Sequence, residues 1–544
     1  MKVPEGFEVQ LVASEDVANG IGKFVPLAFD QKGRLWTTTA LEYPVDGNEN
    51  AAAADALYAG HGKDKVLVFD RDPSSPTGYA SKPRVFADGL AIALGVLPFG
   101  DGCYVHHGHN IEFLHDTDGD GRADKTDVIL TGFGVQDSHL MPHQFTRAPG
   151  GWIWLAQGAF NYGKVHRPND PPETGVQFDQ CRMGKFRPDG GQFTVTSQGP
   201  CNIWGLVING EGEAFIQEAN DYGYPVMPFH EYANYPGCSD KQMKSYAPEF
   251  PGTAPDFRMG GTGLSGLALT DKAGPFPEPW RDVMLVANPI TNRINAIKLH
   301  RDGPRWKLEH LTDLVVSEDP WFRPVAISIG PDGCLYIVDW YNKIISHNEV
   351  PRNHPDRDKT RGRIWRIKPT GAKPFDVPDL TKATGQELIA RLGGDSLTQS
   401  HLAWQALIDR KDEALLPKLR AIARDEKAAA ARRLAATWAL GGQGELDGQI
   451  VLSLLQSDDR NLRREAVAAL GNFAEPEAVE KLLADRRGDP DPEVRATAIR
   501  SLGRRIADAP QYLSDILRFT VAPLNEPVAP FHEKQQADQS ARSV

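Results

Sequence analysis

The feature of this sequence that most constrains its fold is a short phrase that recurs six times in the first 370 or so residues. Each copy has an apolar strand, a turn that contains Gly or Asp, and a second strand rich in aromatic or aliphatic residues. Successive copies lie about 50 to 70 residues apart, which is the length that four antiparallel strands and their turns need. The copies begin at Pro26, Gly95, His143, Gly205, Gly266 and Pro324. The repeat predicts an all-β six-bladed β-propeller over residues 1–370, with each copy as the inner hairpin of one blade.

The ends of such a ring must be joined. Residues 6–14 alternate between apolar and polar side chains, as a half-buried strand does. We expect them to pair with the outer strand of the last blade, at residues 362–367.

The composition changes after Pro369, where Ala, Leu, Arg and Glu dominate and a helical phrase recurs. Its copies at Leu402, Leu434, Glu465 and Ala496 are spaced by about 30 to 33 residues. This spacing predicts an all-α HEAT-like solenoid over residues 380–517, whose repeats contact mainly one another and leave ligand binding to the propeller. Residues 518–544 read as a tail or a linker.

Charge and hydropathy exclude two classes of partner. The formal net charge is −12 and Lys and Arg are not clustered, which argues against a nucleic-acid surface. No apolar run approaches the ~20 residues that a transmembrane helix needs. The start, Met1 to Phe7, has no apolar signal-peptide region, so the residues alone leave open a cytosolic chain or a trimmed targeting segment.

The five cysteines are scattered, without a Cys-x-x-Cys or a Cys-x-x-Cys-His motif. Their spacing therefore predicts no covalent haem and no thiolate zinc cluster in this chain. A Cys201–Cys238 disulfide is compatible with the sequence, although unpaired buried cysteines are favoured.

The strongest local motif is an acidic segment at residues 116–127. Its acidic residues stand at positions one, three, five, nine and twelve, with Gly at position six, which is the spacing of oxygen ligands around Ca²⁺. We expect a structural calcium ion that shapes a long loop of the second blade. The expected ligands are Asp116, Asp118, Asp120, the carbonyl of Arg122, Asp124 and Asp127.

Histidines gather in the second and third copies of the phrase, at His106, His107, His109, His139 and His143. Imidazoles at His107, His109 and His143 could hold a divalent transition metal, or one of them could act as a base near neutral pH. The alternative is a set of hydrogen-bonded loop histidines without a chemical role.

In a propeller, the loop that leads into each innermost strand and the loop that leaves the next strand open on the same face. Polar side chains at these positions suit a polyhydroxylated ligand or a polar cofactor, and a channel-facing Arg323 needs an anionic or carbonyl partner. The candidates are His143, Gln144, Asn202, Thr262, Ser265 and Arg323 in the leading loops, and Glu42, Gln157, Glu218, Asn220, Asp221, Asn288, Asp339, Tyr341 and Asn342 in the leaving loops.

Several of these segments resemble a known family. Together, residues 6–9, 116–121, 202–205, 322–325, 330–333, 339–342 and 362–366 are similar to the membrane-bound dehydrogenases typical of planctomycetes and their relatives. That family combines a propeller, HEAT-like repeats and a cytochrome c module, and its members are exported. The resemblance therefore implies an exported dehydrogenase. Since this chain has no Cys-x-x-Cys-His motif, its haem partner would be a separate protein or a module beyond this sequence.

The propeller is also similar, more distantly, to soluble quinoprotein glucose dehydrogenases, which bind pyrroloquinoline quinone on the same face. Their catalytic His-Gln pair resembles His143-Gln144, and their cofactor-binding Arg-Asn pair resembles Cys201-Asn202, where the Arg is missing.

The leading hypothesis is an exported oxidoreductase that acts on a sugar or polyol. His143 would take the hydroxyl proton, Arg323 and Asn202 would polarise a quinone-like acceptor, and Asp339 would orient the base or the substrate. Further binding residues would be Gln144, Glu218, Asn220, Asp221, Asn288, Tyr341 and Asn342.

Two alternatives remain at this point. One is a carbohydrate lyase or hydratase with a divalent ion on His107, His109 and His143. The other is a glycan-binding propeller without catalysis, whose solenoid docks a cytochrome or another protein. The fold cannot decide among the three.

Overall fold

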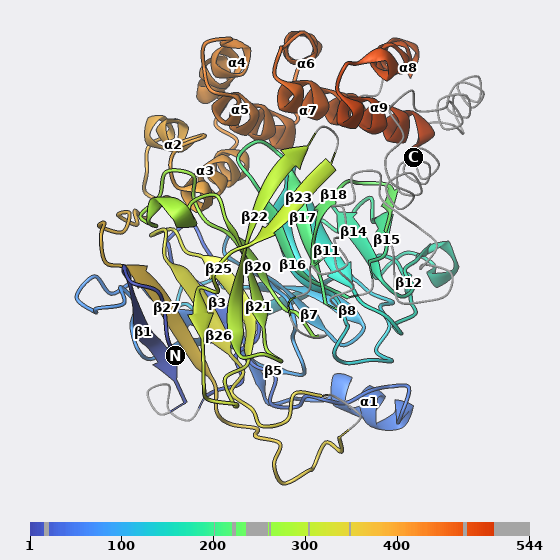
Figure 1. The fold of residues 1–544 in the computed structure, drawn as a ribbon. Coiled ribbons are helices and arrows are strands. Elements are labelled where there is room, and N and C mark those ends of the chain that lie inside the picture. The colour runs from blue at the N-terminus through green and yellow to red at the C-terminus, as the bar shows by residue number, and fades with distance from the viewer. Residues whose placement is uncertain are drawn as a thin grey trace, which may run out of the picture.

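The computed structural model describes residues 1–15, 21–200, 202–219, 225–235, 259, 263–302, 305–346, 350–471 and 476–504. The chain forms a six-bladed β-propeller followed by a helical domain that lies over one end of it (Figure 1). Both halves of the predicted fold are therefore confirmed. The tail at 518–544, the end of the expected solenoid, Cys201 and Cys238 lie outside the described residues. Cys103, Cys181 and Cys334 are buried.

The blades follow the six sequence repeats in order. Blade 1 holds β2 (Ala28–Phe29), β3 (Leu35–Thr38), β4 (Asp64–Phe69) and β5 (Arg84–Leu90); blade 2 holds β6 (Val96–Phe99), β7 (Gly102–His107), β8 (Asn110–His115) and β9 (Lys125–Leu130). Blade 3 holds β10 (His143–Ala148), β11 (Trp152–Gln157), β14 (Arg182–Phe186), β15 (Thr194–Gln198) and β19 (Ala233–Asn234); blade 4 holds β16 (Ile203–Ile208), β17 (Ala214–Glu218) and β18 (Val226–Phe229). Blade 5 holds β20 (Leu267–Leu269), β21 (Met284–Asn288), β22 (Arg293–Asp302), β23 (Arg305–His310) and β24 (Val315–Val316); blade 6 holds β25 (Pro324–Ile329), β26 (Leu335–Asp339), β27 (Arg363–Pro369) and β1 (Phe7–Ser14). Helix α1 (Ala51–Tyr58) and the small hairpin of β12 (Lys164–Val165) and β13 (Val176–Gln177) lie in loops between these strands.

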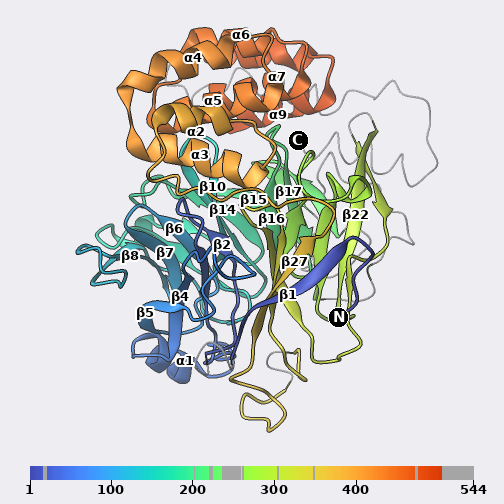
Figure 2. The ribbon, with the colours of Figure 1, turned by 90° about the vertical axis from the view of Figure 1, so that its left-hand side faces the viewer.

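The N-terminal strand closes the ring, as its alternating pattern predicts. Strand β1 pairs antiparallel with β27, with Val9 opposite Ile367 (Figure 2). The outermost strand of the last blade thus comes from the start of the chain. Apolar side chains of neighbouring sheets fill the space between blades, as Phe7, Leu285 and Ile337 do between blades 5 and 6.

Eight α-helices are described after the propeller. They are α2 (Gly385–Arg391), α3 (Leu397–Arg410), α4 (Leu416–Arg424), α5 (Ala430–Gln443), α6 (Gly448–Leu455), α7 (Arg460–Leu470), α8 (Pro476–Asp485) and α9 (Pro492–Arg504). Side-chain caps mark several helix starts: Ser396, Asp447 and Asp459 each accept a hydrogen bond from a backbone N–H of the first turn. The repeated apolar phrases form one continuous core, in which Trp404 of α3 packs on Trp438 of α5 with ring centres 6.0 Å apart.

Helix α3 covers one end of the propeller channel. The channel holds a cavity of about 270 Å³, lined by the six innermost strands and closed by Leu397, His401 and Leu402 of α3. The Thr398 hydroxyl donates to the carbonyl of Ile329, the last residue of β25. The helical domain therefore lies at the channel end opposite the leading loops. The helices of this domain contact mainly one another, as expected, but α3 also forms part of the channel wall.

Candidate functional site

The channel end away from the helical domain is the candidate site, and we call it the mouth. The loops that lead into the innermost strands and those that leave the second strands meet here, together with α1, at the lower end of Figure 1. A row of rings crosses the mouth. The ring centres of Trp340 and Tyr43 are 5.9 Å apart, and those of Tyr43 and His139 are 6.3 Å apart. The His139 ring stacks on Trp204, with ring centres 5.4 Å apart. Two aromatic side chains of the loop after β11, Phe160 and Tyr162, are exposed.

His143 is fully buried at the start of β10 and does not offer a nitrogen to the channel. Its Nδ1 lies 2.6 Å from the Met141 carbonyl oxygen and its Nε2 lies 2.5 Å from the Ile203 carbonyl oxygen. The ring also stacks on Trp204, 3.9 Å between centres. Burial lowers the pKa of His143, although the two carbonyl contacts oppose this shift. Both ring nitrogens thus lie against backbone oxygen atoms of the protein itself.

We expect His143→Ala to destabilise the propeller. Removing a buried, stacked ring leaves a cavity, and comparable aromatic-to-Ala changes cost about 3–5 kcal/mol. Thermal unfolding of the full chain measures the effect. His300→Ala is the matched control, because the His300 side chain is 53% exposed and should leave the melting temperature unchanged. A His143→Asn variant that keeps the wild-type melting temperature but loses turnover would instead assign His143 to the chemistry.

Arg323 and Asp339 organise the loops of blades 5 and 6. The Arg323 guanidinium donates to the backbone carbonyls of Pro289, Asn342 and Lys343, which satisfies the expected need for carbonyl partners. The Asp339 carboxylate accepts from the backbone N–H groups of Arg323 and Tyr341 and from the indole of Trp365. Burial raises the pKa of Asp339 to about 6. Both side chains hold loop backbone in place.

Most other predicted rim residues also bind backbone. The Gln144 amide donates to the Trp204 carbonyl across 3.0 Å, and the Asn202 carbonyl oxygen accepts from the Ala159 N–H across 3.1 Å. The amide of Asn288 donates to the carbonyl of Met259, and that of Asn342 donates to the carbonyl of Asp358. Glu218 is buried at the end of β17, and the Tyr341 ring is covered by the Arg363 guanidinium, 3.5 Å away. Asn220, Asp221 and Thr262 lie outside the described residues.

The structure does not bring the three candidate metal-binding histidines together. The Nδ1 of His107 lies 3.5 Å from the Glu112 carboxylate, whereas the Nδ1 of His109 lies 2.7 Å from the Phe133 carbonyl oxygen. His143 is enclosed by carbonyls. Within the part of the chain that the structure describes, the only group of three or more potential ligands is Asp116, Asp118 and Asp120. The predicted transition-metal site of His107, His109 and His143 is therefore not formed.

Two lysines at the mouth were not predicted from the sequence. Lys23 is fully buried and donates to the carbonyls of Trp340 and Tyr341. Lys359 is half-buried and donates to the Tyr43 carbonyl. Burial lowers the pKa of each to about 8, and the nearby Arg352 and Arg357 add to the effect at Lys359. Neither lysine lies in a motif, so the sequence carried no signal for them.

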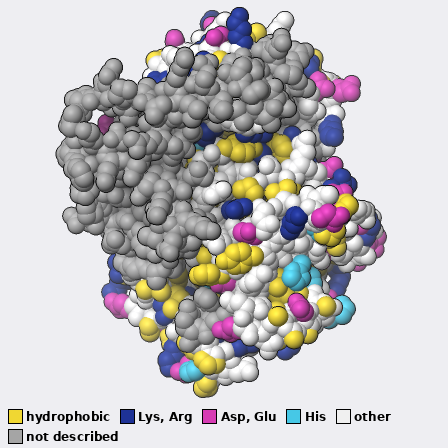
Figure 3. All heavy atoms as spheres, turned by 90° about the vertical axis from the view of Figure 1, so that its right-hand side faces the viewer, with side chains coloured by type: hydrophobic (Ala, Val, Ile, Leu, Met, Phe, Trp, Pro, Cys, Tyr) yellow, Lys and Arg dark blue, Asp and Glu magenta, His cyan; other side chains and the backbone are white. Residues whose placement is uncertain are grey.

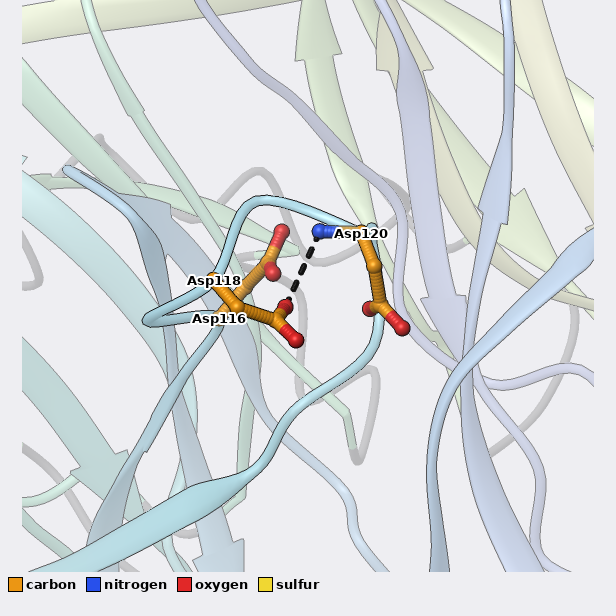
Figure 4. A group of neighbouring side chains, drawn as sticks. All are labelled: Asp116, Asp118 and Asp120. Carbon is orange, nitrogen blue, oxygen red and sulfur yellow. Dashed lines mark hydrogen bonds between the residues drawn. The ribbon is translucent and has the colours of Figure 1, made fainter.

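The acidic segment forms the loop between β8 and β9 (Figure 4). One carboxylate oxygen from each of Asp116, Asp118 and Asp120 lies within 4.8 Å of the others. The backbone N–H of Asp120 donates to Asp118, and that of Arg122 donates to Asp120. Position nine, Asp124, accepts from the hydroxyl of Thr117.

Asp127, at position twelve, lies apart from this group. It belongs to β9, and its carboxylate is 2.9 Å from the Nε2 of His115 and 2.7 Å from the Nζ of Lys125. Asp127, the expected last ligand, is therefore not part of the group. Strand β9 begins at Lys125, and Asp127 pairs with Phe113 of the neighbouring strand β8.

A family model described as a domain of unknown function, DUF7133, matches residues 1–371. This chain belongs to the DUF7133 family. The match covers the whole propeller, and a second model, for HEAT repeats, matches residues 448–523 of the DUF7133 chain, from the start of α6 onward. No curated protein matches this DUF7133 chain. None of its described helices is long and apolar enough to cross a membrane.

Solved structures similar to the DUF7133 chain include several with sugar dehydrogenase names, as well as a luciferin-regenerating enzyme and a putative gluconolactonase. A glucose dehydrogenase is 18% identical, covers 66% of this chain and 99% of its own length, and has a TM-score of 0.39. The aldose sugar dehydrogenase of Escherichia coli, in its apo-form, is 13% identical over 67% of this chain and 99% of its own, with a TM-score of 0.39. The PQQ domain of the pyranose dehydrogenase from Coprinopsis cinerea is 14% identical over 68% of this chain and 96% of its own, also with a TM-score of 0.39. Likeness this distant carries nothing about the reaction of the DUF7133 chain.

Proposed function

We propose that this chain is an oxidoreductase that acts on a sugar or a related polyol at the mouth of its propeller. The observation that carries the proposal is the row of rings from Trp340 to Trp204 with the half-buried amine of Lys359 beside it. Aromatic rings provide flat apolar surfaces for the faces of a sugar ring, while polar backbone and side chains around them bind hydroxyl groups. The resemblance of segments such as residues 322–325 and 339–342 to the membrane-bound dehydrogenases supports the redox class.

The geometry of His143, Asn202 and Asp339 does not fit the quinone site that the resemblance implies. Both ring nitrogens of His143 lie against backbone carbonyls, and the Asp339 carboxylate accepts from three N–H donors. The side-chain oxygen of Asn202 accepts from the Ala159 N–H. We therefore derive no step through such a cofactor.

Lys359 is the residue to which we assign proton transfer. Oxidation of a hydroxyl group to a carbonyl releases the hydroxyl proton and transfers a hydride from the same carbon to a two-electron acceptor supplied from outside the chain. Lys359 in its neutral form accepts the hydroxyl proton, and its pKa of about 8 makes the neutral form accessible near neutral pH. Turnover should therefore rise with pH up to about 8, because the protonated amine cannot accept a proton.

The test is Lys359→Met in the full chain. Glucose and sorbitol serve as probe substrates, with an artificial electron-acceptor dye as the oxidant. We expect loss of general base catalysis to lower turnover about 10² to 10⁴-fold and leave sugar binding by calorimetry near normal. Lys343→Met, on the same loop and 53% exposed, is the control. Wild-type protein that binds a sugar without turnover would contradict the redox assignment and leave a glycan-binding propeller. Turnover unchanged in Lys359→Met would remove Lys359 from the mechanism.

We propose further that the loop of residues 116–124 holds Ca²⁺ as a structural ion. The grouped oxygens of Asp116, Asp118 and Asp120 support this assignment, since oxygen ligands are those that Ca²⁺ prefers. The ion would offset the repulsion between these carboxylates and tie the end of β8 to the start of β9.

Removal of this ion should lower the melting temperature. We expect chelation of the wild type and the substitution Asp118→Ala to lower it by similar amounts, and chelation to have no further effect on the variant. Asp127→Ala is the control, because Asp127 lies outside the group and its variant should still respond to chelation. An unchanged melting temperature of the wild-type protein after chelation would show that the loop is stable without Ca²⁺.

The resemblance also supports a proposal about cellular context. We infer that the protein works outside the cytoplasm and passes electrons to a separate cytochrome, with the helical domain as the docking element. Fractionation of cells that express the native gene, followed by cross-linking on intact cells, tests both parts. Recovery in the cytosolic fraction would contradict the first part, and an exported protein that cross-links to no haem protein would contradict the second.

A further inference from the structure

A second cavity lies between the two domains, away from the mouth. It has a volume of about 470 Å³ and is walled by blades 3 and 4 of the propeller and by helices α5, α7 and α9. Cavities of this size accommodate small organic ligands rather than only single ions. The described part of the face in Figure 3 shows hydrophobic side chains next to Lys and Arg.

The cavity carries cations without carboxylate partners. The Arg187 guanidinium lies 3.6 Å from the ring centre of Trp152, and that of Arg504 lies 4.3 Å from the ring centre of Tyr232. Among the described residues, neither of these arginines nor Arg500 has a carboxylate within ion-pair distance. A guanidinium held face-on by an aromatic ring keeps its N–H donors in the plane of the group, where an oxyanion can accept from them.

Other charges in the cavity wall are already neutralised. Lys185 pairs with Glu231 across 2.6 Å, and Arg464 lies 3.2 Å from both Glu465 and Glu493. The positive charge that remains therefore belongs to Arg187, Arg500 and Arg504.

Two buried donors in the wall have no hydrogen-bond partner. Arg500 is only 7% exposed, and its Nη1 bonds to nothing, whereas its Nη2 donates to the Thr497 hydroxyl. The hydroxyl of Tyr232 is likewise buried without a partner. Burying such donors destabilises the folded state unless an acceptor satisfies them. Both side chains line the same cavity, so one ligand could satisfy both.

We propose that this cavity binds a small organic oxyanion, a carboxylate or a phosphate carried on a ring. The oxyanion accepts from Arg500 and Tyr232 and is held by the charge of Arg187 and Arg504. The ring packs on the apolar wall that Trp154, Phe229 and Trp438 provide. Because the walls come from both domains, the ligand binds only the docked arrangement and stabilises it. This site is separate from the mouth, and its occupancy does not depend on the proposed oxidoreductase activity.

The test uses the full chain with phenyl phosphate, benzoate and uncharged benzyl alcohol, by calorimetry and thermal unfolding. We expect saturable one-to-one binding of phenyl phosphate or benzoate that raises the melting temperature and weakens with salt, and no binding of benzyl alcohol. The first two probes distinguish a phosphate site from a carboxylate site. Inorganic phosphate alone should bind more weakly, because it lacks the ring.

Arg500→Met removes the charge but keeps most of the side-chain volume, and it should weaken binding about tenfold or more. Arg495→Met, on the same helix but outside the cavity, should bind as the wild type does. If Arg500→Met does not fold, Tyr232→Phe replaces it: the lost hydroxyl has no partner, so folding should persist while affinity falls. Wild-type protein that binds neither anionic probe up to millimolar concentration would overturn the proposal, and so would wild-type affinity in a folded Arg500→Met or Tyr232→Phe variant.

Discussion

A chain that ends at residue 371 is expected to be insoluble or to melt on the order of 10 °C below the full chain, because it loses contacts between the domains that include buried ion pairs. Removing α3 uncovers the channel end and leaves Arg147, which is 7% exposed, without the two-point ion pair that it makes with Asp409. The carboxylate of Asp271 also loses the backbone N–H of Leu397 that it accepts from.

Circular dichroism and thermal unfolding of the purified fragment measure this effect. A chain that ends at residue 523 retains every described helix and the whole HEAT-repeat match, and it is the control, with an unchanged melting temperature expected. A soluble 1–371 fragment with the melting temperature of the full chain would show that the propeller does not need the helical domain, as the sequence repeats alone suggest.

The substitution Glu493→Gln is expected to produce the second large effect. Glu493 of α9 is 3% exposed and lies at the centre of a charge cluster between the domains. Its carboxylate is 2.9 Å from Arg301 of β22, 2.6 Å from Arg460 and 3.2 Å from Arg464 of α7. With a neutral amide at this position, the positive charges of three arginines are less fully neutralised. Breaking a buried ion pair in this way destabilises the folded state by about 3–5 kcal/mol. Thermal unfolding near pH 7 measures it.

Glu309→Gln is the matched control for this variant. Glu309 pairs with His300 at the surface, where its side chain is 57% exposed, and surface pairs contribute about 0–1 kcal/mol. Equal melting temperatures for Glu493→Gln and the wild type would show that the cluster does not hold the domains together.

The pH dependence of the Glu493 effect has a definite sign. Burial would raise the pKa of Glu493, but the nearby Arg464, His230, Arg460 and Arg301 outweigh burial and hold it well below its usual range. A carboxyl with a lowered pKa stabilises the folded state above its unfolded pKa, and this contribution disappears as the pH falls through the folded pKa. The difference in melting temperature between the wild type and Glu493→Gln should therefore shrink below about pH 4.5. A difference that grows on acidification would contradict this assignment.

Asp271 works in the opposite direction, because burial raises its pKa to about 6 and outweighs the hydrogen bond from the Leu397 N–H. Its stabilising contribution is complete below its unfolded pKa and is lost as the pH rises through about 6. The two carboxyl groups at the domain interface thus respond to acid in opposite ways.

The architecture follows from local patterns, which is why the sequence alone determined it. An alternating strand buries one face and a helix with period 3.6 buries one stripe, so six repeated hairpins and four repeated helical phrases specify blades and helices without any knowledge of distant contacts. The pairing of β1 with β27 belongs here too, because the alternating pattern of residues 6–14 predicts a strand, and joining the two ends of the ring places that strand in the last blade.

Only the tertiary structure decided which polar residues face solvent and which hold the fold together. The nitrogens of His143 lie against carbonyls of Met141 and Ile203, and the second of these is 60 residues away in the sequence. Arg147 donates to Asp409, which lies 262 residues away in the sequence, and the amine of Lys359 donates to the carbonyl of Tyr43, 316 residues away. The physical reason is that a buried polar atom takes whichever partner the packed domains bring within about 3 Å, and hydrophobic periodicity does not encode that partner.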